Sequence, residues 1–324
     1  MNTAVTGGSG VVGQAVVRHL IADGHEVRAL ARSDESAALL AEMGAEVTRG
    51  DLLDAGSIDS LVRGRDWMFH IGGVNELCSA DPYRVWKVNV EGTRIVLGAC
   101  RRGDVGRLVH TSSAVTLGEA HGTVGSENTV HRGSYLSDYE RSKHAAERLL
   151  FQRAAGLDVV AVNPSSVQGP GRGTGSAVLL MEAVRGRSPF LVDTVFSLVD
   201  IDDCARGHLL AAAKGGTGQR YVLSGSVTSA REVVRTLNQA LGRHWAPFYL
   251  NQWVVSAAAS VAGSVARFLG KTSPLCPESA RVLFHGSRYD GSRATRELGL
   301  EYTPLEDTLK RAVSWFAAVG LIQR

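Results

Sequence analysis

The first two hundred residues alternate short apolar runs with longer amphipathic segments, and this alternation constrains the fold more than any other feature of the sequence. The short runs have the length of buried strands. The segments between them repeat apolar residues at three- and four-residue spacing, which is typical of helices packed by one face. Strands that alternate with helices in this way assemble into a parallel sheet covered on both faces. The sequence therefore predicts an α/β protein with a doubly wound parallel sheet.

The elements can be assigned to residue ranges. Strands are predicted at Thr3–Val5, Glu26–Ala31, Glu46–Thr48, Trp67–Ile71, Arg107–Thr111 and Asp158–Asn163, with Tyr221–Leu223 as a further candidate strand of the same sheet. Helices are predicted at Val11–Asp23, Glu35–Met43, Ile58–Val62, Pro82–Arg102 and Tyr139–Ala155. Glycine clusters follow Asn163, and helices dominate from Arg231 onward. We expect a main domain over 1–168, completed by 196–226, and a smaller, mainly helical domain over 169–195 and 227–324.

Composition and charge exclude several classes of protein. The 324 residues are 44% hydrophobic and 21% charged, which is the balance of an ordinary globular chain. The net charge is only +3 and no run of like charges occurs, so we expect no nucleic-acid partner. The four cysteines, Cys78, Cys100, Cys204 and Cys276, are scattered without a C-x-x-C pair, and the ten histidines form no H-E-x-x-H motif. These patterns favour a reducing compartment, no disulfide framework and no metal.

One uncharged apolar stretch, Trp253–Ala266, is similar to a membrane segment. It is shorter than the roughly 20 residues that a span requires, and Arg267 interrupts it, so we expect no membrane span. A buried or dimer-facing helix is favoured over a helix that lies on a membrane or contacts an apolar substrate. The N-terminus has no basic and apolar leader, and the expected location is therefore cytoplasmic.

A glycine-rich segment joins the first predicted strand to the first predicted helix. It reads TGGSGVVG and consists of Thr6, Gly7, Gly8, Ser9, Gly10, Val11, Val12 and Gly13. Glycines permit a tight turn and a close approach of a pyrophosphate to the helix N-terminus, where free N–H groups favour anions. The order of strand, glycine turn and helix therefore predicts a dinucleotide site.

The end of the second predicted strand indicates which dinucleotide binds. An NAD-binding chain places an acidic residue there for the ribose hydroxyl, whereas this chain has Arg32, which suits a 2′-phosphate. A solvated surface arginine is the alternative, because Asp34 and Glu35 follow closely. NADP is favoured over NAD.

Tyr139 and Lys143 begin a predicted helix at i and i+4, so the two side chains share one face. We expect the lysine charge to lower the pKa of the phenol and make it an acid–base group. Tyr83 and Lys87 have the same spacing but precede the fifth predicted strand, whereas Tyr139 follows it. That strand ends in Thr111, Ser112 and Ser113 at the sheet edge where ligands bind. A serine there can hold a carbonyl oxygen beside the tyrosine, and Lys143 can bind the nicotinamide ribose.

Several motifs in order resemble an extended short-chain dehydrogenase/reductase with a Rossmann domain, of the epimerase/dehydratase and dihydroflavonol-reductase-like branch. They are TGGSGVVG, GDLLD, HIGG, NVEGT, HTSSAVTLG, YERSK, NPSSVQGPGR and VDIDDCARGH. The resemblance covers nearly the whole chain and implies Ser113, Tyr139 and Lys143 as the catalytic residues. It also implies cofactor contacts at Asp51, Leu52, His70, Ile71, Gly72, Thr111, Pro164, Ser165 and Ser166, beside those of the glycine loop and Arg32. HIGG departs from the alanines usual in the branch, and Asn89 is expected to brace the backbone.

Three functions are compatible with these motifs. The first is an NADP(H)-dependent oxidoreductase that moves a hydride between nicotinamide and a secondary alcohol or ketone. The second is a nucleotide-sugar epimerase or dehydratase with tightly bound NAD, for which Arg172, Arg185 and Arg187 could bind a diphosphate. The third, a non-catalytic cofactor sensor, is disfavoured because serine, tyrosine and lysine are all present.

The second domain favours the first function. Val178–Met181, Phe190, Val195 and Phe196 are apolar, which indicates an apolar small-molecule substrate of the dihydroflavonol or steroid type. The expected substrate contacts are Val74, Ser113, Val115, Gln168, Met181 and Phe196. The loop Glu119–Leu136 is expected over the active site. The resemblance implies a homodimer through the helices at Pro82–Arg102 and Tyr139–Ala155.

Overall fold

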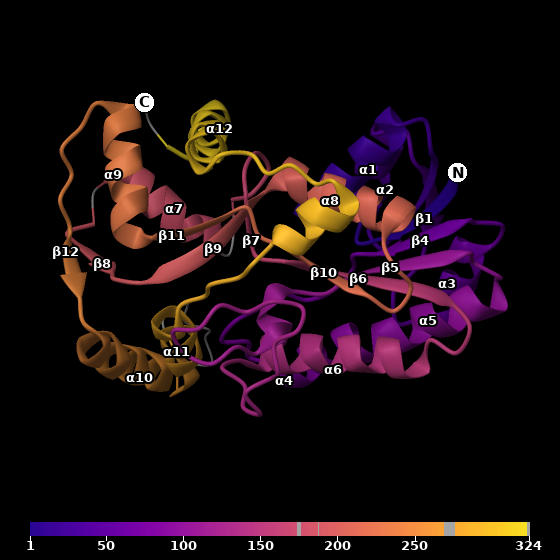
Figure 1. The fold of residues 1–324 in the computed structure, drawn as a ribbon, viewed down its shortest axis with the longest axis horizontal. Coiled ribbons are helices and arrows are strands. Elements are labelled where there is room, and N and C mark those ends of the chain that lie inside the picture. Colours follow the sequence, from indigo (N-terminus) through magenta and orange to yellow (C-terminus); the bar gives the residue numbers. More distant parts are fainter. Residues whose placement is uncertain (174–175, 187, 269–275, 323–324) are drawn as a thin grey trace.

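The computed structural model describes residues 1–173, 176–186, 188–268 and 276–322. Its centre is a seven-stranded parallel sheet in the order β10-β6-β5-β4-β1-β2-β3 (Figure 1). These strands are β1 (Asn2–Thr6), β2 (Glu26–Ala31), β3 (Glu46–Arg49), β4 (Trp67–His70), β5 (Arg107–Thr111), β6 (Asp158–Pro164) and β10 (Arg220–Leu223). The predicted doubly wound sheet is confirmed, and Tyr221–Leu223 lies in its edge strand β10.

The strands are apolar on both faces because helices cover both. Val109 and Val160 belong to the core on one face, whereas their chain neighbours Leu108 and Val159 belong to the core on the other, as the two-residue period of a strand requires. One face carries α1 (Val11–Ala22), α2 (Asp34–Glu42) and α8 (Ile201–Lys214). The other carries α3 (Ala55–Val62), α5 (Gly92–Arg102) and α6 (Asp138–Arg153).

The helix predicted over Pro82–Arg102 is interrupted in the structure. It consists of α4 (Pro82–Trp86), a π-helical segment η1 (Lys87–Glu91) and α5. Asn89 lies in the π segment, where its side chain bonds the backbone of Val74 and the Ser142 hydroxyl. A π segment inserts one residue into a helical turn. The spacing of apolar residues did not predict this interruption, because the partners of Asn89 lie outside its helix.

Most of the remaining elements form a second region beside the sheet. It contains a three-stranded sheet in the order β11-β9-β7 and a two-stranded sheet of β12 and β8. Its apolar core gathers Met181, Val233, Leu237, Leu309 and Phe316 from three helices. The bounds in this region are β7 (Ser166–Gln168), α7 (Ser176–Arg185), β8 (Phe190–Val192), β9 (Val195–Asp200), β11 (Ser226–Ser229), α9 (Ala230–Leu241), β12 (Phe248–Leu250), α10 (Gln252–Phe268), α11 (Pro277–His285) and α12 (Leu305–Ala318). Two short segments belong to the main sheet instead: η2 (Ala114–Leu117) packs against α6 and β6, and η3 (Ala294–Leu298) packs against α8 and β10.

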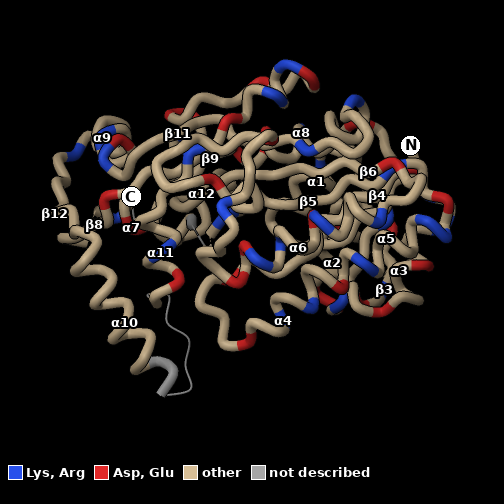
Figure 2. The backbone as a smooth tube through the Cα atoms, turned by 60° about the horizontal axis from the view of Figure 1, so that its bottom comes forward, with Lys and Arg blue, Asp and Glu red and all other residues tan. Residues whose placement is uncertain are grey.

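The apolar stretch at Trp253–Ala266 lies in α10, and Figure 2 shows a long run of this helix without charged residues. Val255 and Ala259 are buried, and α10 packs against α11. Trp253 is 82% exposed, so the expectation of a buried helix is wrong for this face. A dimer contact there stays a prediction. Among the described residues, no helix combines the length and apolar character needed to cross a membrane.

The expectation of no disulfide is wrong for one pair, and that pair also counts against the expected reducing compartment. Cys78 and Cys276 form a disulfide, whereas Cys100 and Cys204 are free and buried. The paired cysteines are separated by 198 residues in the sequence, and only the fold brings their Cα atoms to 6.2 Å.

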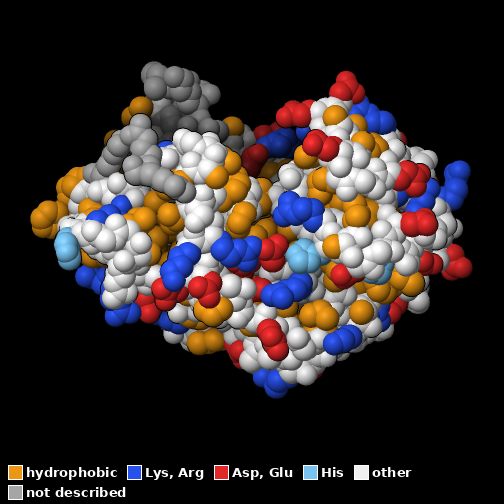
Figure 3. Space-filling view, turned by 90° about the horizontal axis from the view of Figure 1, so that it is seen from above, with side chains coloured by type: hydrophobic (Ala, Val, Ile, Leu, Met, Phe, Trp, Pro, Cys, Tyr) orange, Lys and Arg blue, Asp and Glu red, His pale blue; other side chains and the backbone are white. Residues whose placement is uncertain are grey.

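Charges of both signs are interspersed on the face shown in Figure 3.

Candidate active site

The glycine loop forms a closed turn at the N-terminus of α1. Gly7 has a φ of +72°, a conformation that side chains disfavour. A Cβ on Gly13 would lie 2.0 Å from the Gly7 carbonyl oxygen, so only glycine allows the helix to start this close to the turn. Gly10 caps α1 without a side-chain hydrogen bond, and no acidic residue lies in the first turn. The first N–H groups of α1 are thus left for an anion such as a pyrophosphate.

The end of β2 presents an exposed arginine. The Arg32 side chain is 84% exposed and its guanidinium lies 3.9 Å from the Asp51 carboxylate. Asp34, the nearest acidic residue in the sequence, is bound instead by Arg49 at 2.6 Å. Ion pairs this exposed are weak, so Arg32 can exchange Asp51 for another anion.

His70 acts as a brace under the glycine loop. Its ring nitrogens lie 2.8 Å from the Thr6 hydroxyl and 3.1 Å from the Thr93 hydroxyl, and the side chain is buried. The Thr6 hydroxyl also accepts a hydrogen bond from the Gly72 backbone. Burial lowers the pKa of His70 to about 3, with the Lys143 charge as a second cause. The imidazole is therefore neutral, and its contacts join β1, β4 and α5.

Tyr139 and Ser113 meet across the ends of α6 and β5. The Ser113 side chain lies beside the Tyr139 hydroxyl and interacts with it. Burial raises the pKa of Tyr139, and this interaction and the charge of Arg172 oppose the rise only in part. The expectation that Lys143 lowers the pKa of this phenol is therefore wrong in this structure. The i and i+4 spacing in the helix did not predict that the lysine ammonium bonds the Thr111 carbonyl.

Lys143 turns toward the end of β5. Its ammonium donates a hydrogen bond of 2.7 Å to the Thr111 carbonyl, and the side chain is only 6% exposed. Burial lowers the pKa of Lys143 to about 8, while the charge of Glu147 acts in the opposite direction. The Thr111 hydroxyl lies 2.9 Å from a ring nitrogen of His208, whose pKa burial lowers to about 4. Tyr83, the other tyrosine with this spacing, is 72% exposed in α4 and has no comparable surroundings.

Behind Lys143 lies a buried polar network that the sequence patterns did not predict. Asn163 donates hydrogen bonds to Glu147 at 2.6 Å and to the Thr116 hydroxyl at 2.9 Å. Arg220 in β10 donates to the other oxygen of Glu147 at 3.0 Å. Glu147 lies one helical turn after Lys143, and this i+4 spacing was the sequence feature that could have indicated a contact between them. Arg172 also acts on Tyr139 through its charge, a role not anticipated for it.

Three expected cofactor contacts, Pro164, Ser165 and Ser166, lie at the end of β6 and directly after it. Pro164 is buried, the Ser165 backbone N–H donates to the Leu223 carbonyl at 2.9 Å, and Gln168 donates to the Ser166 hydroxyl at 3.1 Å. Asn89 braces the backbone at Val74, as expected.

The residues expected to contact substrate lie in two places, some beside Ser113 and others in the second region. Val115 follows Ser113 in η2, whereas Met181 is buried in the core of the second region and Phe196 packs against that core. Arg185 bonds Glu182 and the Leu321 carbonyl, and Arg187 lies outside the described residues. The loop Glu119–Leu136 is tied to the C-terminal segment, because the Gly125 N–H donates to the Arg288 carbonyl at 2.8 Å.

Comparison with known families decides where the chain belongs. The model of the NAD dependent epimerase/dehydratase family matches residues 3–224. This protein is a member of that family. The matched range includes the glycine loop and the Ser113, Tyr139 and Lys143 positions.

The similarity to individual relatives extends over nearly the whole chain. The sterol demethylase protein B of Methylococcus capsulatus is 32% identical over 99% of this chain and 100% of its own. A Synechocystis protein provisionally named as a dihydroflavonol 4-reductase is 31% identical over 98% of this chain and 95% of its own. The crystal structure of gox2253 superposes with a TM-score of 0.86 at 30% identity and covers 99% of both chains. The chain is an NAD(P)-dependent short-chain dehydrogenase/reductase acting on alcohol and carbonyl groups.

Proposed function

We propose that this protein is an NADP(H)-dependent reductase that converts a ketone of an apolar, polycyclic small molecule into a secondary alcohol. The observation that carries the proposal is the placement of Ser113 beside Tyr139, a buried phenol whose pKa is raised by that burial. A phenol that keeps its proton at neutral pH is suited to donate it to an alkoxide as that charge develops. Arg32 supports the choice of NADP, because it is exposed and its guanidinium lies as far as 3.9 Å from its ion-pair partner Asp51.

The proposed mechanism assigns one task to each residue. The nicotinamide, when bound, supplies the hydride that adds to the carbonyl carbon. Tyr139 gives its hydroxyl proton to the carbonyl oxygen, and the Ser113 hydroxyl donates a hydrogen bond to that same oxygen. Lys143 holds the cofactor ribose from the end of β5, with Glu147 behind it as a buried counter-charge. The first turn of α1 binds the pyrophosphate and Arg32 the 2′-phosphate.

The names of two relatives support an apolar substrate. One is named for sterols and the other for a dihydroflavonol, and both words denote fused-ring molecules that carry hydroxyl or carbonyl groups. The apolar surroundings of Phe196 in the second region agree with such a ligand. We assign cofactor binding to 1–168 with 196–226, and substrate binding to 169–195 with 227–324. A homodimer belongs to the same proposal.

A nucleotide-sugar epimerase or dehydratase with retained NAD is the second candidate. Arg172 favours it, because it is half-buried and its charge reaches Tyr139. A cation in that place could bind a substrate phosphate. Arg185 supports the candidate less, since Glu182 and the Leu321 carbonyl occupy its guanidinium.

The deciding experiment measures cofactor binding and turnover with NADPH and NADH side by side. Thermal shift reports binding, and absorbance at the nicotinamide band reports oxidation against steroid and flavanone ketones. We expect preferred NADPH binding and net oxidation that Tyr139→Phe abolishes. Tightly retained NAD without net consumption would favour the epimerase. Binding of NADPH without turnover by any member of either class would favour the sensor.

A further inference from the structure

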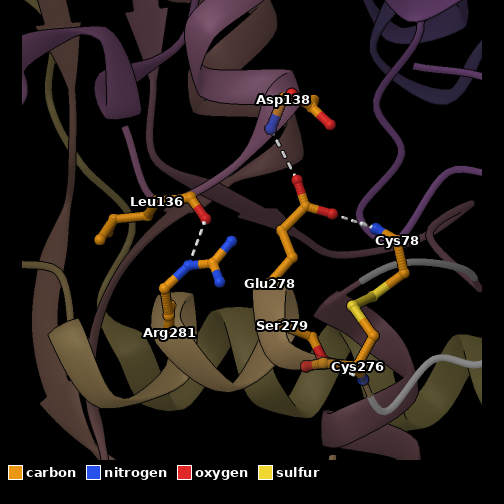
Figure 4. The surroundings of a disulfide bond; sticks show 7 residues. All are labelled: Cys78, Leu136, Asp138, Cys276, Glu278, Ser279 and Arg281. Atoms are coloured by element: carbon orange, nitrogen blue, oxygen red, sulfur yellow. Dashed lines mark hydrogen bonds between the residues drawn. A yellow bond between two sulfur atoms is a disulfide. The ribbon is translucent and has the colours of Figure 1, made fainter. Parts of the chain in front are cut away.

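The N-terminal turn of α11 contacts the segment that follows β4 and the start of α6, where Tyr139 lies. Figure 4 shows the Glu278 side chain pointing between Cys78, in the segment that follows β4, and Asp138, the first residue of α6. One carboxylate oxygen accepts a hydrogen bond from the Asp138 backbone N–H at 2.6 Å, and the other accepts one from the Cys78 backbone N–H. A residue of the second region thus links two segments of the sheet's active-site edge.

The hydrogen bond from Asp138 satisfies an N–H group that the helix itself leaves without a partner. The first N–H groups of a helix have no partner inside the helix, and the helix dipole makes that end positive. In α6 the Ser137 hydroxyl accepts from the Glu140 N–H, and Glu278 accepts from Asp138. A carboxylate is well suited here, because two oxygens can accept from two donors and its charge complements the helix end. Tyr139 is the next residue of this turn.

Two more links hold α11 in this place. The disulfide between Cys78 and Cys276 joins the residue before α11 to the segment after β4. Arg281, one turn further along α11, donates a hydrogen bond of 3.2 Å to the Leu136 carbonyl. The chain on both sides of Ser137 is therefore tied to α11 (Figure 4).

We propose that Glu278 is a positioning residue for Tyr139 and that the Cys78–Cys276 disulfide holds Glu278 in place. This inference rests on the proposed role of Tyr139. Glu278 contacts neither substrate nor cofactor in the scheme. It fixes the first turn of α6, and with it the distance between the Tyr139 hydroxyl and the carbonyl oxygen held by Ser113. Proton transfer depends steeply on that distance.

The test compares Glu278→Ala and Glu278→Gln with Glu306→Gln in the full-length protein. Glu306 is an exposed acid at the start of α12, paired with Lys310 at 2.8 Å and remote from these contacts. Removing the carboxylate should lower kcat about tenfold and leave the Kd for NADPH unchanged, because only orientation is lost. A glutamine amide has one acceptor oxygen for the two N–H donors, so Glu278→Gln should have an intermediate kcat. Glu306→Gln should match the wild type.

The role of the disulfide is tested by a double-mutant cycle. Changing both Cys78 and Cys276 to serine should lower kcat in the wild-type background and less so in the Glu278→Ala background, because both changes disturb the same contact. Equal effects in both backgrounds would show that the disulfide acts independently of Glu278 and would overturn that half of the inference.

Amide hydrogen exchange over residues 136–142 gives a readout that needs no substrate. Faster exchange in Glu278→Ala than in Glu306→Gln, with a lower kcat, supports the inference. Unchanged exchange, or unchanged kcat in an enzyme that turns over, overturns it. If the wild type reduces no ketone, the proposed function fails, and the exchange measurement alone decides whether Glu278 fixes this turn.

Discussion

The two ends of the active-site edge are built by opposite means. The cofactor end depends on missing side chains: Gly7 and Gly13 bring the backbone and the start of α1 together. The proton-transfer end depends on buried polar side chains, where Lys143, Glu147 and Asn163 are all shielded from water. Steric room decides what binds at the first end, and desolvation decides the protonation states at the second. Substitutions should therefore separate binding from chemistry.

The largest effect is expected at the proton-transfer end. Tyr139→Phe removes the hydroxyl that Ser113 contacts, and kcat should fall about 10³-fold because the general acid is lost. The Kd for NADPH should stay within about twofold of the wild type, since the glycine loop is unchanged. Steady-state kinetics and a fluorescence titration check both values. Parallel losses of binding and turnover would contradict the separation of the two ends.

At the cofactor end, Gly13→Ala should show the reverse pattern. The new Cβ would lie 2.0 Å from the Gly7 carbonyl oxygen, so the turn must move. Overpacking of this kind costs about 1–3 kcal/mol, which corresponds to a roughly 5- to 140-fold weaker Kd for NADPH. Gly98→Ala in α5 is the matched control, because its nearest contact is the flexible end of Arg102. A Gly13→Ala protein with unchanged affinity would show that the turn tolerates a side chain.

Buried histidines should make the proton-transfer end sensitive to acid. Burial lowers the pKa of His208 to about 4 from an ordinary value of 6.5. Between these values the unfolded chain binds a proton that the folded chain does not, so stability falls as the pH drops through this window. The contribution of His208 between pH 7 and 5 is about 2 kcal/mol.

Urea unfolding at pH 7, 6 and 5 checks this contribution. His208→Gln should lose its share of the pH dependence, whereas a substitution of the exposed His244 by glutamine should not change the slope. Identical slopes in the wild type and His208→Gln would mean that this imidazole titrates normally.

The smallest effect is expected at the cofactor end, where it distinguishes NADP from NAD. Arg32→Ala should weaken NADPH binding about tenfold and leave NADH binding unchanged, because only the 2′-phosphate loses a partner. Arg63→Ala removes another exposed arginine outside the proposed site and serves as the control. Equal losses for both cofactors would assign Arg32 a structural role and favour NAD.

Sequence patterns predicted the sheet, the glycine turn and the helix that carries Tyr139, because all three depend on local order along the chain. The strand–glycine–helix order of residues 2–22 and the i+4 pair at Tyr139 are visible in the sequence itself. The direction of the Lys143 head group was not, since Thr111 lies 32 residues away and competes with the phenol for it. The Cys78–Cys276 pair and the Glu278 contacts depend on how the second region docks, which no local pattern encodes.

The position of β10 in the chain has a consequence for synthesis on the ribosome. Strand β10 pairs with β6, but it is made only after the chain has passed through β7, α7, β8, β9 and α8. During that interval β6 is an uncovered sheet edge with unpaired backbone groups, the kind of edge that recruits strands from other chains. A transcript truncated before Arg220 would therefore yield an aggregation-prone product, whereas one that extends past Leu223 can close the sheet.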